Sequence, residues 1–511
     1  MSSTMTINSI PPELLGEIFC QCTASYAESP LVLSAVSSHF RTVVCATPRA
    51  WTRLRLRVGA ASAYHQSKRA EQWFRMAKDC TVNVFVDVVS LDGEEVDTSE
   101  VVLPSDGRIQ SSSSLLPVLR SHIPQIRTLV LRSSTEALLH SYLALLYPEN
   151  APVRLDILQH LTVSITEDIP PTPSTAVSAL LSPAPPPIIA PFPAFTSLET
   201  LRLTNHFLPN SPQLLSNLRH FHFKRPLRAP PVSLTDVFGL LTHAPQMVTL
   251  DLQCRTLDDQ VPPEDDAEPA SDILLSDLSH LSLRCNNIEQ LLNRLALPAL
   301  SSLSIDDLDS HSPEQHLGAA LRGLLVRSAL VGYRAGLKHL DLTNVAMCPA
   351  RRGRVGEDAA TWEWCFARMS ALESISLTSG EGSEHLGLLN LLVRGSLTSF
   401  LLDHNGRSRI DGQGIVCPRL KRLTLSAPFV IDPFAADTFR MCRPGAELTL
   451  REVADDVIPF AIFASFGLVD PLGPRGPGTK PGVGQGRRGG FGFGSMFDRR
   501  RKVKGDEGKA L

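Results

Sequence analysis

The chain has 511 residues, of which 43% are hydrophobic and 20% are charged, and its formal net charge at neutral pH is −3. This composition is typical of a globular protein and excludes a mainly disordered or fibrous chain. The length allows two or more domains, or one elongated repeat array. The charge is uneven, because residues 471–511 hold ten Lys or Arg against three Asp or Glu, which leaves about −10 on the rest.

The cysteines and the apolar runs indicate which cellular compartment to expect. The ten cysteines are scattered, without a C-x-x-C or other metal-ligand spacing. We therefore expect reduced, mostly buried thiols, no metal and no cofactor. The first 25 residues lack a signal-peptide pattern, and the longest apolar run, residues 458–469, is too short to span a bilayer and predicts a buried terminal element. These features predict a protein of the cytoplasm, the nucleus or both, without membrane contact.

Residues 7–19, INSIPPELLGEIF, predict a helix with a dense apolar stripe. Pro11 and Pro12 suit a first helical turn, whose N–H groups lack partners. The residues expected on one face of this helix are Leu14, Leu15, Ile18, Phe19 and Cys22. A second periodic run, residues 29–51, predicts further short helices. Helices this short cannot bury all their apolar faces against one another. Their cover would come from the following domain or from another protein.

The stretches IPPELLGEIF (10–19) and LSAVSSHFRTVVCATPRAWTRLRL (33–56) together resemble an F-box, in the form that is abundant in fungi. Ser37 stands where the family usually has Cys, and Phe40 where it usually has Trp. The resemblance implies that residues 8–57 bind the Skp-type adaptor of a cullin-based ubiquitin ligase. It assigns to the adaptor-facing surface, or to its support, Pro11, Leu14, Leu15, Ile18, Phe19, Val36, Phe40 and Trp51.

Residues 64–80 predict a helix and residues 81–89 a strand. Trp73, Phe74 and Ala77 on this helix are expected to dock the N-terminal helices on the part of the chain that follows. Such a joint would be rigid, and it would hold a bound target at a set distance.

One six-residue phrase (apolar, two polar, apolar, polar, apolar) recurs between residues 123 and 450. Its eleven copies begin at residues 126, 158, 198, 218, 247, 278, 300, 337, 372, 397 and 420. Helix-like runs lie between the copies, for example at 234–245 and 288–298. One strand and one helix per repeat, with a Leu-x-x-Leu-x-Leu strand, resembles an irregular leucine-rich-repeat array. Such repeats often have an Asn after the strand, and the residues near this position are Asn205, Asn286, Asn344 and Asn405.

This pattern predicts an α/β solenoid, with parallel strands on a concave face and helices on the convex side. Strand side chains alternate, so the Leu positions would be buried and the positions between them would face the concavity. The residues expected there to bind a protein target are Arg202, Thr204, His222, Lys224, Asp251, Gln253, Arg284, Asp341, Thr343 and Asp403. Both charge signs occur, without a single-sign stripe or an aromatic cluster, which favours a protein surface over nucleic acid. Solvated strand positions without a partner are the alternative.

The predicted organisation has five parts: a disordered start (1–7), an F-box-like domain (8–57), a connecting region (58–122), the repeat array (123–460) and a terminal element with a basic tail (461–511). Proline-rich residues 168–195 and acidic residues 257–272 predict loop insertions. The tail predicts disorder, and Arg499, Arg500, Arg501, Lys502 and Lys504 resemble a nuclear import signal. A solvated basic tail is the alternative.

The sequence carries no P-loop, metalloprotease, nucleophile-elbow or kinase motif. Cys365 lies in an amphipathic helix and is expected in the core, although a thioester-forming cysteine is the alternative. We therefore expect a non-catalytic subunit that presents a protein target to a Skp–cullin–F-box-type ubiquitin ligase. The alternatives are a leucine-rich-repeat scaffold whose first helices only cap the array, and an RNA-associated protein that binds through its tail.

Overall fold

The computed structural model describes residues 7, 10–59, 62–88, 115–134, 139, 142, 157–166, 197–206, 216–258, 272–308, 316–332, 336–345, 355–379, 387–393, 416–427 and 431–452. All of them belong to one unit of the chain, residues 1–458. The expectations for the loop insertion at 168–195, the phrase at 397, the apolar run at 458–469 and the tail lie outside the described residues, as does nearly all of the insertion at 257–272.

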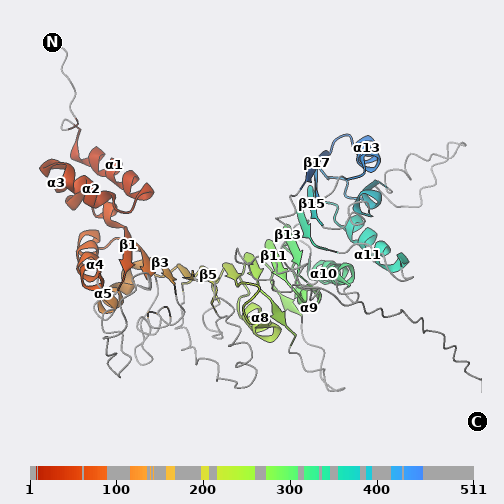
Figure 1. Ribbon diagram of the computed structural model, residues 1–511, viewed down its shortest axis with the longest axis horizontal. Helices are drawn as coiled ribbons and strands as arrows, with labels where there is room; N and C mark the ends of the chain where they lie inside the picture. The colour runs from red at the N-terminus through yellow and green to blue at the C-terminus, as the bar shows by residue number, and fades with distance from the viewer. Residues whose placement is uncertain are drawn as a thin grey trace, which may run out of the picture. The chain divides into compact units, whose positions relative to one another are not determined.

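The described part of the chain begins with three helices, and helices also lie between several of the strands that follow (Figure 1). The helices are α1 (Pro12–Ser25), α2 (Ser29–Val36), α3 (Ser38–Ala46), α4 (Ala63–Ala77), α5 (Leu115–His122), α8 (Leu234–His243), α9 (Ile288–Asn293), α10 (Leu317–Gly332), α11 (Val355–Arg368) and α13 (Pro433–Cys442), with 3-10 turns η2 (Pro48–Trp51) and η4 (Ile123–Gln125). The strands of the main sheet are β1 (Arg53–Val58), β2 (Val82–Val88), β3 (Ile126–Ser133), β4 (His160–Ile165), β5 (Thr200–Thr204), β6 (His220–Lys224), β8 (Thr249–Gln253), β11 (His280–Cys285), β13 (Ser302–Asp307), β14 (His339–Thr343), β15 (Ser374–Thr378), β16 (Arg422–Ala427) and β17 (Glu447–Glu452).

These strands form one parallel sheet in which the spatial order follows the chain order from β1 to β17. Two short parallel pairs lie beside it, β7 (Val232–Ser233) with β9 (Thr256–Leu257), and β10 (Ile273–Leu274) with β12 (Leu295–Ala296). Neighbouring α9, α10 and α11 pack against one another along the sheet (Figure 1). The predicted mixed α/β fold with a large parallel sheet is confirmed.

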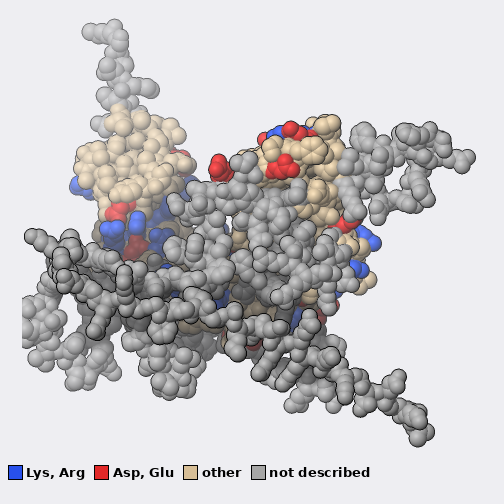
Figure 2. All heavy atoms as spheres, turned by 45° about the vertical axis from the view of Figure 1, so that its right-hand side comes forward, with Lys and Arg blue, Asp and Glu red and all other residues tan. Residues whose placement is uncertain are grey.

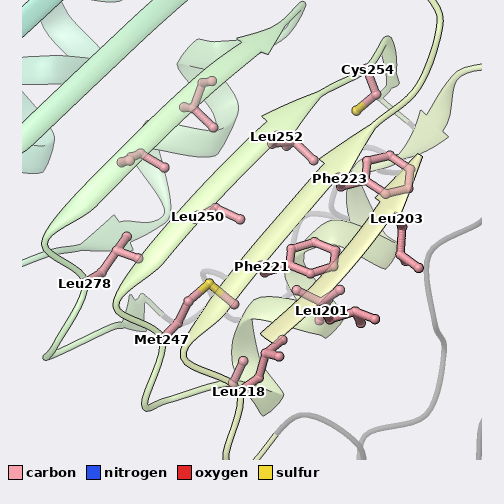
Figure 3. Packing of buried hydrophobic residues seen from close by; sticks show 14 of the residues in the cluster. Leu201, Leu203, Leu218, Phe221, Phe223, Met247, Leu250, Leu252, Cys254 and Leu278 are labelled. Atoms are coloured by element: carbon pink, nitrogen blue, oxygen red, sulfur yellow. The ribbon is translucent and has the colours of Figure 1, made fainter. Parts of the chain in front are cut away.

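The recurring phrase sets both the strands and their register. Each of its ten copies within the described residues coincides with a strand. The strands pair phrase to phrase, so that Leu281 of β11 lies beside Leu250 and Leu303 on its two neighbours. The side chains of such equivalent positions line up on one face of the sheet (Figure 3). Each fully buried Leu or Phe stabilises the fold by about 1.5–3 kcal/mol, so a shift of register would be costly.

The sheet begins earlier than expected. The sequence predicted its first repeat strand at residue 126, but β1 starts at Arg53 and pairs in parallel with β2, which pairs with β3. The expected boundary at residue 57 therefore falls within the first strand, and the expected start of the array at residue 123 falls after two strands of the same sheet. Leu54 and Leu56 occupy the buried positions of β1 and are fully shielded from solvent.

Two asparagines that follow strands each form hydrogen bonds with both neighbouring strands. Asn205 and Asn344 adopt left-handed backbone conformations, with φ of 57° and 56°, which Asn tolerates better than most residues. The Asn205 N–H donates to the carbonyl of Lys224 on the next strand (2.7 Å), and its side-chain amide donates to the carbonyl of Ile165 on the previous one (2.9 Å). Asn344 does the same between Thr378 and the Asp306 carboxylate.

Asn286 departs from this arrangement. Its side chain bonds the backbone of Thr256, and the left-handed residue there is Asn287, with φ of 55°. The fourth predicted position, Asn405, lies outside the described residues.

The predicted helix and strand at 64–89 are confirmed as α4 and β2. Trp73, Phe74 and Ala77 are buried, as expected for a joint. Trp73 meets Trp51 edge to face, with ring centroids 4.8 Å apart, and Phe74 stacks on His122 at 4.3 Å. The aromatic contacts of α4 thus connect the turn after α3 with α5. Among the described helices, none combines the length and apolar character needed to cross a bilayer.

Candidate functional site

Several exposed apolar side chains lie on the first three helices, which neighbour one another. Helix α1 contacts α2 and α3, and the two prolines open α1, which begins at Pro12 with Pro11 at its N-cap. Leu14 and Ile18 on α1 are 58% and 48% exposed. Val32 and Val36 on α2 are 56% and 61% exposed. We call these four residues the N-terminal apolar surface. On the visible face this part of the molecule shows few charged atoms (Figure 2).

The prediction that the apolar residues of α1 share one face is wrong, because they form two stripes. Leu15 and Phe19 are buried, whereas Leu14 and Ile18 point away from the core. Phe19 packs on Phe40 with ring centroids 5.2 Å apart. The chain itself therefore covers one stripe and leaves the other exposed.

The eight residues assigned to the adaptor-facing surface divide in the same way. Pro11, Leu14, Ile18 and Val36 are exposed, and Leu15, Phe19, Phe40 and Trp51 are buried. The indole N–H of Trp51 donates to the carbonyl of Val44 (2.9 Å), so this buried polar group is satisfied. The buried four hold the three helices and η2 together and are not part of any exposed surface.

Two further contacts fix how α1 sits on its neighbours. A Cβ added at Gly16 would meet the Thr47 hydroxyl at 3.0 Å, so the glycine permits close packing of the helix there. At the edge of the exposed stripe, Arg49 forms an ion pair with Glu17 (3.3 Å). An apolar patch with a charged edge is the usual form of a protein-binding surface.

The second candidate surface is the face of the sheet opposite the buried Leu positions, which we call the polar face. Alternate residues of most strands lie on it, as the burial patterns of β4, β6, β11 and β14 illustrate. Nine of the ten residues predicted to bind a target are on this face, half-buried or exposed, namely Arg202, Thr204, His222, Lys224, Asp251, Gln253, Arg284, Asp341 and Thr343. Asp403, like the five residues of the nuclear import signal, lies outside the described residues.

The polar face carries ion pairs between neighbouring strands. His222 Nδ1 lies 3.6 Å from the Asp251 carboxylate, and this contact lowers the pKa of Asp251. Arg284 Nε lies 2.9 Å from Asp306, a carboxylate whose pKa is raised because burial outweighs the nearby guanidinium. The sequence prediction omitted Asp306, although it occupies the same strand position as Arg284.

The charges on the polar face are separated along the sheet, contrary to the expectation of mixed signs. From β1 to β6 it carries Arg53, Arg55, Arg57, Arg132, Arg202 and Lys224 against one acid, Asp87. From β8 to β14 it carries three acids, Asp251, Asp306 and Asp341, against Arg284. These residues are far apart in the sequence. The pairing of the strands brings them together into one mainly basic and one mainly acidic region.

The described cysteines include the one considered above as a thioester-forming residue, Cys365. Nine are free, of which Cys254, Cys285, Cys365 and Cys417 are buried and five are half-buried, so the expectation of mostly buried thiols holds for four. Burial raises the pKa of Cys365 to about 12, and its thiol contacts the Gly318 carbonyl (3.7 Å). A reactive cysteine needs an accessible thiolate, so Cys365 belongs to the core.

Within the described ranges no three His, Cys, Asp or Glu side chains gather closely enough to hold a metal ion. Compared with known proteins, the chain matches no protein-family model, and no curated protein is significantly similar to it.

Proposed function

We propose that this protein is the substrate-recognition subunit of a Skp–cullin–F-box-type ubiquitin ligase. Residues 8–57 would serve as the F-box, and the parallel sheet that begins at β1 would be an irregular leucine-rich-repeat array that holds a protein target. The subunit would act by proximity, keeping a target lysine near a charged conjugating enzyme, without making bonds itself.

The observation that carries the proposal is the N-terminal apolar surface on α1 and α2. Leu14, Ile18, Val32 and Val36 lie on two helices that contact each other, and each is about half or more exposed. Burial of such a side chain against a partner contributes about 1.5–3 kcal/mol, so four of them favour a stable complex. The stripe is supported from beneath by the buried layer of Leu15, Phe19 and Phe40, which gives it a fixed shape.

The joint at α4 also supports the proposal. A subunit that presents a target needs its adaptor-binding and target-binding parts at a fixed separation. Trp51 and Trp73 are both buried and in contact, and β1 follows Trp51 directly, so the helices are continuous with the sheet.

The test is a pull-down with a purified Skp-type adaptor, comparing the wild type with Leu14→Asp combined with Ile18→Asp. The matched control is Val326→Asp with Leu330→Asp on α10, another pair of exposed apolar residues four positions apart on a helix. We expect the control to recover adaptor like the wild type and the α1 pair to recover little. Equal recovery by all three proteins would refute the adaptor role.

The rival scaffold function, in which the first helices only cap the sheet, leaves the exposed stripe without a role. Deletion of residues 1–57 does not separate the two functions, because it removes nearly all of β1 and the Trp51 that packs on Trp73. The surface substitutions avoid that difficulty, since Leu14 and Ile18 are outside the core.

A further inference from the structure

The polar face over β3–β6 is a cationic region with no acid of its own on that face. Arg132 lies on β3, Arg202 on β5 and Lys224 on β6, and none of the three forms an ion pair with another described residue. Arg132, Arg202 and Lys224 are also exposed. Within the described part of the chain, no carboxylate lies within ion-pair distance of these three charges.

Three histidines lie among these cations. His160 on β4 and His220 on β6 occupy the same row of the sheet, with Thr200 of β5 between them. His222 lies beside Arg202 in the next row. Because neighbouring strands are about 4.8 Å apart, His160 and His220 are separated by about 10 Å. We call Arg132, His160, Arg202, His220, His222 and Lys224 the basic region.

The basic region ends abruptly at β8. Asp251 on β8 contacts His222, and Asp306 and Asp341 follow on β13 and β14. A partner with a long run of negative charge would be repelled there. This argues against the phosphate backbone of a nucleic acid, which carries charge at every residue and usually stacks its bases on aromatic side chains. Among the described polar-face residues from β3 to β6, none is Phe, Tyr or Trp.

The spacing of the cations also selects among anionic peptides. The three charges lie on three different strands and in two rows, so they are spread over the face of the sheet. A phosphoryl group is bound best by several donors that converge. Carboxylates distributed along an extended chain match one cation per strand. Such a chain advances about 3.3 Å per residue, so about five residues cross β3–β6.

We infer that the basic region binds a short carboxylate-rich segment of the target protein, and that this segment lies across β3–β6 and stops before β8. The inference rests on the proposed function, because it names the chemistry of the target that the ligase subunit would recognise. Arg202 and Lys224 are the main specificity-determining residues, and His220 adds to the attraction when it is protonated.

His220 makes the binding depend on pH. The pKa of His220 is lowered, first by burial and then by His222, Arg219 and His160, against the opposite effect of Glu199. The other charged groups that face the three imidazoles are Arg202, Lys224 and Asp251. His220 is therefore neutral at neutral pH and gains its proton more readily beside a bound carboxylate. Affinity for an acidic segment should therefore rise as the pH falls below about 6.5, the ordinary pKa of an imidazole.

The experiment uses the full-length protein and a fluorescein-labelled peptide of about twelve residues in which Glu alternates with Ser, a length that exceeds the crossing distance of β3–β6. Fluorescence anisotropy at low salt compares the wild type with Arg202→Glu combined with Lys224→Glu. The matched control is Arg422→Glu with Arg451→Glu on β16 and β17, the same charge change on the same face. Circular dichroism verifies the folding of each variant.

We expect the Arg202 and Lys224 pair to lose about tenfold or more in affinity and the control pair to lose less than about twofold, with tighter binding by the wild type near pH 6 than near pH 7.5. Equal losses in both variants, or no binding of the acidic peptide, would overturn the inference. Tighter binding of a single-stranded oligonucleotide, or of the same peptide with phosphoserine in place of one Glu, would also overturn it.

The result is separable from the proposed function. Adaptor capture depends on the N-terminal apolar surface and should be unchanged in both charge variants. A wild-type protein that captures the adaptor but does not bind the peptide would refute only the present inference, and a wild-type protein that binds the peptide but does not capture the adaptor would refute only the ligase role.

Discussion

The indole rings of Trp51 and Trp73 meet edge to face, 4.8 Å apart, and both are about 1% exposed. Trp51 closes the N-terminal helices and directly precedes β1, whereas Trp73 lies on the helix between β1 and β2. This contact joins the proposed adaptor-binding helices to the sheet, and its loss should affect both parts together.

We predict that Trp73→Ala lowers the free energy of unfolding by about 3–5 kcal/mol, because it leaves a large cavity beside Trp51. Tyr64→Ala on the same helix is the control, since Tyr64 is 62% exposed, and it should change stability by less than about 0.5 kcal/mol. Urea denaturation followed by circular dichroism measures both. Equal small effects would show that the tryptophan contact does not stabilise the joint.

A charge on the buried stripe of α1 should destabilise the fold, whereas a charge on the exposed stripe should not. Leu15→Asp places a charge in a site that is 1% exposed, so we expect the N-terminal helices to unfold and the protein to aggregate or become protease-sensitive. Leu14→Asp, at a site that is 58% exposed, should leave the melting temperature nearly unchanged. Limited proteolysis with thermal melts distinguishes the two. Similar destabilisation by both would mean that Leu14 also belongs to the core.

The left-handed conformation of Asn344 predicts a graded response. Asn344→Ala loses the hydrogen bond to Asp306 and places a β-carbon at a φ of 56°, which together should cost about 2–3 kcal/mol. Asn344→Gly loses the bond but adopts this φ without strain, and should cost about 1 kcal/mol. Chemical denaturation provides the comparison. A smaller loss for alanine than for glycine would contradict the backbone argument.

Three buried thiols should make the fold less stable in alkali. Burial raises the pKa of Cys254, Cys365 and Cys417 to about 12, against 9.0 for an exposed thiol. Above about pH 9 the unfolded chain therefore releases protons that the folded chain retains, and the free energy of unfolding falls as the pH rises. Their contribution is complete below about pH 9 and is lost towards about pH 12.

Denaturant midpoints near pH 8 and pH 10 test this dependence, where each thiol contributes a loss of the order of 1 kcal/mol. In Cys365→Ala the decline should be smaller by the share of one thiol. A decline of the same size in this variant would show that the pKa of Cys365 does not differ between the folded and the unfolded chain.

The repeat strands could be predicted because each has its own Leu-x-x-Leu-x-Leu phrase. The sequence prediction still missed β1, and it placed the strand at 81–89 outside the repeat array. Trp51, Leu54 and Leu56 fit the phrase but lie within the segment interpreted as a separate domain, and β2 alternates valines without the first apolar residue. At the other end β17 has Gly445 in that place, three residues before Leu448, which the phrase excludes.

The two stripes of α1 could not be separated from sequence, because a helical period places Leu14, Leu15, Ile18 and Phe19 on one broad face. Their separation depends on Phe40, which packs on Phe19 from α3. The charge separation on the polar face likewise depends on the pairing of strands far apart in the chain, such as Arg202 beside His222 and His222 beside Asp251.

The central claim is that the N-terminal apolar surface of α1 and α2 binds a Skp-type adaptor. Isothermal calorimetry with purified adaptor tests it most directly, on the wild type, on Leu14→Asp with Ile18→Asp, and on Val326→Asp with Leu330→Asp. We predict tight binding by the wild type and the α10 control, and a loss of about a hundredfold or more for the α1 pair, equivalent to two buried apolar side chains. Equal affinities in all three proteins, or no binding by the wild type, would contradict the account.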